Sequence, residues 1–96
     1  MSHALPVIFA AKAVAGSARC GGLTLHMVDD LRTKAEELLE RGDPLRLAVL
    51  AFATMYEEYH RDTYAMQKLG ESLDVAVHIA LNPEAQPLRE RRDIDG

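Results

Sequence analysis

Several features are scarce in this 96-residue chain, and each scarcity excludes a class of protein. The only cysteine, Cys20, cannot form an internal disulfide, which favours a cytoplasmic protein over a disulfide-stabilised secreted one. Eleven Lys and Arg against fifteen Asp and Glu leave a formal net charge of −4, which argues against nucleic-acid binding. Residues 4–14 are apolar, but Lys12 lies inside them rather than ahead of them, unlike in a signal peptide. The longest apolar run elsewhere, residues 47–53, is far shorter than the ~20 residues of a membrane span. We therefore expect a soluble cytoplasmic protein with no nucleic-acid or membrane partner.

The sequence also lacks the motifs by which many enzymes and cofactor-binding proteins are recognised. It contains no GxGxxG, Walker A, GxSxG or HExxH pattern. The triplet from His60 to Asp62 matches a kinase catalytic loop, but Gln67 stands where that loop has a metal-binding Asn, and no Gly-rich loop precedes it. A single cysteine cannot anchor a zinc finger. We therefore expect a protein that is not an enzyme and has neither cofactor nor metal.

Helical periodicity followed by a sharp break is the clearest positive signal. Hydrophobic residues make up 48% of the chain, which is enough for a packed core. Residues 24–41 have the three-four apolar spacing of an amphipathic helix, with one face formed by Val28, Leu31, Ala35 and Leu38. We expect Gly42 to end this helix in the left-handed conformation, Asp43 to cap the next helix, and Pro44 to take its first position. So short a connection predicts an αα-hairpin.

A second, long helix is predicted over residues 44–69. Its apolar residues recur every seven positions, at Leu45, Phe52, Tyr59 and Met66. Its first half is apolar nearly all round and therefore needs cover on more than one side. A single chain of this size is too small to provide all of that cover, so we expect a homodimer.

Residues 73–81 allow two interpretations. Alternation of Leu73, Val75 and Val77 with less apolar residues is typical of a strand, whereas Leu73, Val77 and Leu81 also share one face of a helix. We favour the helix, which gives an all-α protein, and keep an α+β fold with a small strand pair as the alternative. The expected organisation is one helical domain over residues 1–81, with an apolar N-terminal arm over residues 1–15 and a flexible tail over residues 82–96.

Tyrosine and methionine gather in the second half of the long helix. Because these residue types are enriched at protein interfaces, we predict a partner-binding surface formed by Phe52, Met55, Tyr56, Tyr59 and Met66. Acidic residues would rim this surface and steer it toward a basic partner; they are Glu57, Glu58 and Asp62. An alternative is a small metal- or ligand-binding bundle that uses Glu57 and His60, whose E-x-x-H spacing occurs in di-iron helical bundles.

The plan of a short, acidic, mainly helical chain with the Gly42-Asp43-Pro44 hairpin resembles the small quorum-sensing anti-activators of proteobacteria, of the QslA and TraM type. The resemblance covers residues 23–81 in outline and has no signature motif. It implies a protein that sequesters a LuxR-type transcription factor by direct contact. We therefore expect a non-enzymatic regulator that binds another protein, and a phage or plasmid anti-defence inhibitor is a further alternative.

Overall fold

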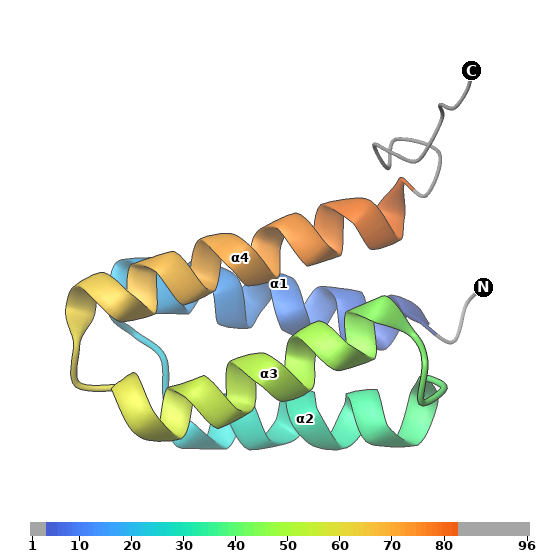
Figure 1. Cartoon of the computed structure of the whole chain (residues 1–96), viewed down its shortest axis with the longest axis horizontal. Helices are drawn as coiled ribbons and strands as arrows, with labels where there is room; N and C mark the ends of the chain where they lie inside the picture. The colour runs from blue at the N-terminus through green and yellow to red at the C-terminus, as the bar shows by residue number, and fades with distance from the viewer. Residues whose placement is uncertain (1–3, 83–96) are drawn as a thin grey trace.

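Residues 4–82 are described by the computed structural model, and they form four helices joined by short turns (Figure 1). The helices are, in chain order, α1 (Leu5–Cys20), α2 (Leu25–Leu38), α3 (Pro44–Tyr59) and α4 (Thr63–Leu81). Each helix runs antiparallel to the one before it, and α4 returns to pack along α1, so the four close into a ring. The all-α prediction is confirmed, and residues 4–82 contain no strand.

The apolar N-terminal segment, which we predicted as an arm over residues 1–15, is helical from Leu5 onward and packs into the core. In α1, Val7, Ala11 and Val14 follow the three-four spacing of a buried helical face, and all three are almost completely buried. Alanines and exposed apolar residues such as Phe9 hide this periodicity in the sequence. The helix ends at Gly21, whose φ of 90° is left-handed and whose N–H donates to the Ser17 carbonyl at 2.8 Å.

The turn between α2 and α3 confirms one part of the hairpin prediction and corrects another. Asp43 caps α3, because its carboxylate accepts a hydrogen bond from the Leu45 N–H at 2.9 Å, and Pro44 opens the helix. However, α2 ends at Leu38 rather than at residue 41, and Gly42 is not left-handed; among residues 4–82, Gly21 is the glycine with positive φ. The helix stops early because Leu39 leaves it in an extended conformation and buries its side chain in the core.

The single long helix predicted over residues 44–69 is two helices. The helix is interrupted by a turn at residues 60–62, between the end of α3 at Tyr59 and the start of α4 at Thr63. Asp62 causes the new start: its carboxylate accepts from the Ala65 N–H at 3.1 Å and so satisfies one of the free donors of the first turn of α4. This turn lets α4 fold back along α3. The returning helix covers much of the apolar surface of α3 that we had expected a second copy to cover.

The helix that starts at Thr63 continues to Leu81, so the helical interpretation of residues 73–81 is correct. Leu73 and Val77 lie on its buried face. Gly70 lies against α1 so closely that a Cβ atom there would be 2.9 Å from the Ala15 carbonyl oxygen. The tail predicted over residues 82–96 lies, apart from Asn82, outside the described residues.

A single core runs through the ring of helices, and all four contribute to it. Its largest fully buried side chains are Val7, Val14, Leu31, Val49, Leu73 and Val77. No buried polar or charged residue occurs within residues 4–82, so apolar packing holds this part of the chain together. None of the four helices is both long enough and apolar enough to cross a membrane.

Candidate functional site

The five residues predicted to bind a partner do not share one surface. Phe52 and Met66 are core residues, with 3% and 6% of their surface exposed, and Tyr56 is half-buried. Met55 and Tyr59 are exposed at 37% and 39%. The break at residues 60–62 is the reason: it folds Met66 back into the core of the bundle instead of extending it along the helix.

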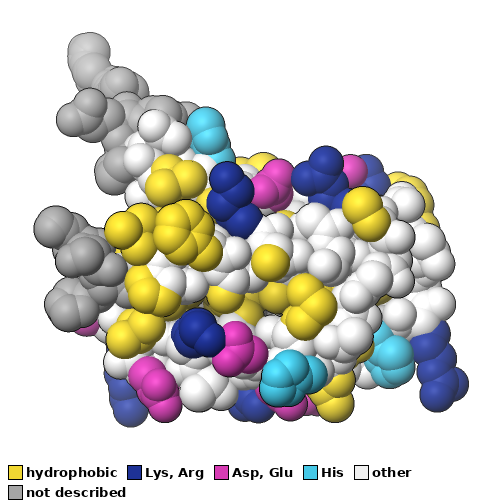
Figure 2. Space-filling view, turned by 180° about the vertical axis from the view of Figure 1, so that it is seen from behind, with side chains coloured by type: hydrophobic (Ala, Val, Ile, Leu, Met, Phe, Trp, Pro, Cys, Tyr) yellow, Lys and Arg dark blue, Asp and Glu magenta, His cyan; other side chains and the backbone are white. Residues whose placement is uncertain are grey.

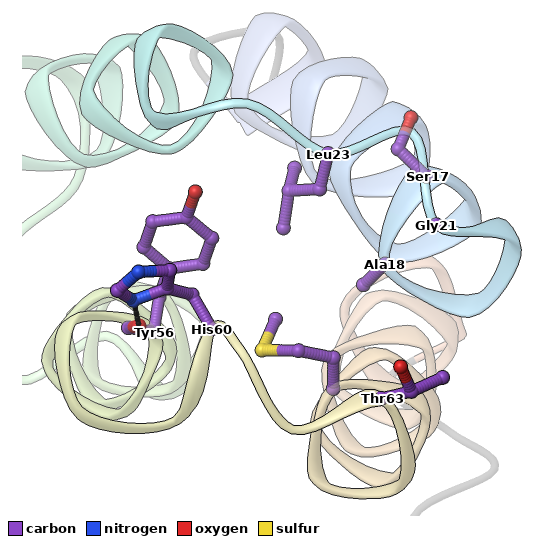
Figure 3. A pocket seen from close by; sticks show the side chains of 8 residues that line it. Ser17, Ala18, Gly21, Leu23, Tyr56, His60 and Thr63 are labelled. Carbon is purple, nitrogen blue, oxygen red and sulfur yellow. Dashed lines mark hydrogen bonds between the residues drawn. The ribbon is translucent and has the colours of Figure 1, made fainter.

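A pocket of about 140 Å³ opens at the end of the bundle where α3 turns into α4 (Figure 3). It is bounded by the end of α1, the following loop, the end of α3 and the start of α4. Figure 3 shows Leu23 and Tyr56 projecting into it from different walls, with His60 beside Tyr56. The lining residues are Ser17, Ala18, Gly21, Leu23, Tyr56, His60, Thr63 and Met66.

Tyr56 and His60 form one wall of this pocket as a packed pair. Their ring centroids are 5.3 Å apart with a 32° angle between the ring planes. The His60 Nδ1 atom lies 3.1 Å from the Tyr56 carbonyl oxygen, one helical turn earlier. Because a carbonyl oxygen only accepts, Nδ1 carries the proton in this hydrogen bond, which leaves Nε2 as an acceptor in the neutral ring. The wall therefore offers an aromatic surface with polar edges, suited to an inserted side chain.

Exposed tyrosines and charged residues occur at the end of α3 and the start of α4, next in sequence to the lining residues of the pocket. Tyr59 ends α3, and Tyr64, which is 69% exposed, stands in the first turn of α4. The Nζ atom of Lys68 lies 5.5 Å from the centre of the Tyr64 ring, a cation–π contact that restrains this ring on the surface. Glu57 and Glu58 of the predicted acidic rim are exposed, and Glu57 lines a hollow between α2 and α3 rather than this pocket.

The E-x-x-H pair of Glu57 and His60 is not joined by a third ligand. Within residues 4–82, no group of three or more His, Cys, Asp and Glu side chains is placed so that it could hold a metal ion. His60 is the C-cap of α3 rather than an interior helical residue, and its Nδ1 atom is already hydrogen-bonded. Cys20, the last residue of α1, is exposed.

A second hollow, which we call the α3–α4 groove, was not expected from the sequence. It has a volume of about 100 Å³, its floor is formed by Phe52 and Leu73, and its walls are Ala48, Ala51, Met55, Leu69 and Ser72. Leu47, one helical turn before Ala51 on α3, is 55% exposed. In the sequence, Ala48 and Ala51 belong to the part of the predicted long helix that is apolar nearly all round. They form one side of a groove because α4 returns beside them.

The face of the molecule that is hidden in Figure 1 combines charged side chains with an apolar patch at one end (Figure 2). The patch lies at the end of the bundle where α1 begins and α4 ends. Exposed hydrophobic residues near these helix ends are Leu5 and Phe9 of α1 and Leu81 of α4. Charged side chains spread over the rest of this face.

Comparisons of the chain with protein-family models, with curated proteins and with solved structures found no match.

Proposed function

We propose that this chain is a non-enzymatic regulator that binds another protein through the end of the bundle at the α3–α4 turn. The supporting observation is the pocket beside Tyr56 and His60. Two exposed tyrosines, Tyr59 and Tyr64, neighbour the lining residues His60 and Thr63 in the sequence. Tyrosines that border a small pocket are a common form of binding hot spot, because they bury a large area at little cost in side-chain entropy. The partner inserts a side chain into the pocket and packs against the two exposed rings.

The acidic residues near the α3–α4 turn indicate the kind of partner surface that would bind there. Three acidic residues, Glu57, Glu58 and Asp62, precede or form the turn, and the whole chain carries a net charge of −4. A basic surface would therefore be attracted to this end of the bundle. The resemblance to anti-activators suggests a transcription regulator as the partner, because such proteins carry basic surfaces for DNA.

The experiment compares proteins retained from a host lysate by the wild-type chain and by Tyr59→Ala. We expect at least one protein to bind the wild type and to be lost with Tyr59→Ala, while the helical circular dichroism stays the same. Tyr64→Ala should weaken the same interaction. Thr33→Ala is the matched control, because Thr33 is exposed on α2, away from the turn.

Association and dissociation rates of the purified chain and the captured protein then test the role of the acidic residues. Glu57→Gln and Glu58→Gln should slow association and reduce its dependence on salt, with little effect on dissociation. Equal retention of every protein by wild type and Tyr59→Ala would contradict the proposal.

A further inference from the structure

We propose that the pocket at the α3–α4 turn binds an arginine side chain of the partner, with the guanidinium group packed on the rings of Tyr56 and His60. The inference rests on the proposed function and deepens it, because it names the side chain that the partner inserts. It follows from the size of the pocket, the hydrogen-bonding groups that line it, its aromatic wall and the electrostatics of the helix ends around it.

The pocket has the size of a site for one side chain. Its volume is about 140 Å³, whereas sites that enclose a small-molecule ligand start at roughly 300 Å³. A free cofactor or metabolite would therefore stay largely outside it. A side chain that projects from a partner's surface needs no such enclosure, because the partner itself covers the mouth of the pocket.

The lining contains two acceptors that favour a hydrogen-bond donor. The first is the Ala18 carbonyl oxygen: the Gly22 N–H, four residues on, donates to the Ser17 carbonyl oxygen instead, at 3.0 Å, and no other backbone N–H in the turns within residues 4–82 donates to Ala18. Helix carbonyls point toward the C-terminal end, and this is the end of α1 that borders the pocket. Ala18 is only 4% exposed, and a buried carbonyl oxygen without a donor is costly. The second acceptor is His60 Nε2, because Nδ1 carries the proton shared with the Tyr56 carbonyl oxygen.

Arginine matches this lining better than any other side chain does. Its guanidinium group carries only N–H donors in a planar fork, so it can donate to more than one acceptor. Its plane also stacks on aromatic rings, and Figure 3 shows Tyr56 and His60 side by side as such a wall. A lysine ammonium is a compact charge that cannot stack in this way. An apolar side chain would leave the Ala18 carbonyl oxygen without a donor.

The electrostatics of the surrounding helix ends also favour a cation. The pocket is lined by the C-terminal ends of α1 and α3, where the helix dipoles are negative. The positive start of α4 is offset by the carboxylate of its cap, Asp62. Arg19, which follows Ala18, pairs with Asp74 at 3.1 Å, and Arg61 is exposed in the turn and is not a lining residue. The lining residues thus include no cationic side chain that would repel an incoming guanidinium group.

The first test compares capped tripeptides that differ only in the central residue: acetyl-Gly-Arg-Gly-amide and its lysine and norleucine counterparts. Each is titrated into the isotope-labelled chain and followed by the amide NMR signals of Ala18 and Thr63. We expect saturable shifts with the arginine peptide, with a dissociation constant in the millimolar range. The lysine peptide, which carries the same charge, should bind about threefold more weakly or less, and the norleucine peptide should cause no saturable shift.

The second test removes the acceptor and keeps the ring. His60→Phe retains an aromatic wall without Nε2, so it should weaken binding of the arginine peptide by about tenfold. His78→Phe is the matched control: it makes the same exchange at an exposed residue of α4 that lines a different hollow, and it should leave binding unchanged. Circular dichroism should show the same helix content for both variants.

The assignment would be overturned by the absence of saturable millimolar binding of the arginine peptide, by equal binding of the arginine peptide and either counterpart, or by unchanged affinity in His60→Phe. Each of these results could occur while a lysate protein still binds the wild type and is lost with Tyr59→Ala. The failure of this inference is therefore distinguishable from the failure of the proposed function.

Discussion

At the scale of single residues, Gly70 allows the close packing of α4 against α1. A Cβ atom there would lie 2.9 Å from the Ala15 carbonyl oxygen, 3.0 Å from Arg19 Cγ and 3.1 Å from Ala18 Cβ. Arg19 can move, because its side chain is half exposed, but the Ala15 oxygen belongs to the backbone of α1. Glycine at this position therefore lets α1 and α4 pack closer than any other residue would.

Gly70→Ala should lower the free energy of unfolding by roughly 1–2 kcal/mol, although alanine is the better helix former, because α1 and α4 must separate to admit the methyl group. Gly16→Ala is the control within a helix. A Cβ atom at residue 16 meets nothing within 4 Å, so the exchange should stabilise the protein by up to about 1 kcal/mol. Urea denaturation measures both, and equal stabilisation by the two exchanges would contradict the close packing at Gly70.

We also expect the two turn glycines, Gly21 and Gly42, to differ in how much their exchange for alanine destabilises the protein. Gly21 has a φ of 90°, so Gly21→Ala should cost about 1 kcal/mol through backbone strain. Gly42, which the sequence led us to expect in this conformation, does not have positive φ, and a Cβ atom there meets nothing within 4 Å. Gly42→Ala should therefore leave the melting temperature nearly unchanged; a loss as large as that of Gly21→Ala would place the left-handed turn at Gly42 after all.

At the scale of helices, the side chains that begin each helix decide how the chain is divided. Asp43 and Asp62 cap α3 and α4 by the same type of hydrogen bond. Only the first was recognised from the sequence, because Gly42 and Pro44 flank it with further turn signals, whereas the apolar repeat from Leu45 to Met66 continues across Asp62. A capping residue without glycine or proline beside it is a weak signal against a continuous hydrophobic pattern.

Asp43→Ala and Asp62→Ala should each reduce the free energy of unfolding by roughly 0.5–2 kcal/mol, since each leaves an N–H group at a helix start without its partner. Asn accepts the same hydrogen bond, so Asp62→Asn should retain most of the stability. Thermal melts followed by circular dichroism measure these differences. If Asp62→Ala melts with the wild type, the cap does not hold the start of α4.

The α1 helix shows a different limit of sequence reasoning. Its buried face consists largely of alanine and valine, while Leu5 and Phe9 on its other side are exposed. Apolar residues thus occur on both sides, and a simple contrast between hydrophobic and polar positions does not reveal the helix. The α3–α4 groove and the pocket could not be predicted for a different reason. Both require α4 to return beside α3, which depends on contacts between segments that are distant in the sequence.

At the scale of the whole molecule, α1 is an integral part of the core rather than an extension from it. It contributes six of the buried residues, and it packs along both α2 and α4. Removal of residues 1–20 would expose the apolar faces of both neighbours. A chain that begins at Gly21 should therefore lose the cooperative thermal transition of the full chain. A sharp melt of the shortened chain, recorded by circular dichroism, would show that α2, α3 and α4 fold without α1.

The antiparallel ring has a practical consequence for how the molecule can be held. Because the chain runs along the bundle four times, α1 begins and α4 ends at the same end, and the α3–α4 turn lies at the opposite end (Figure 1). A fluorophore, a surface anchor or a fused carrier attached ahead of α1 is thus carried about one helix length from Tyr59. Immobilisation through that end orients every molecule in the same direction, with the pocket pointing away from the support.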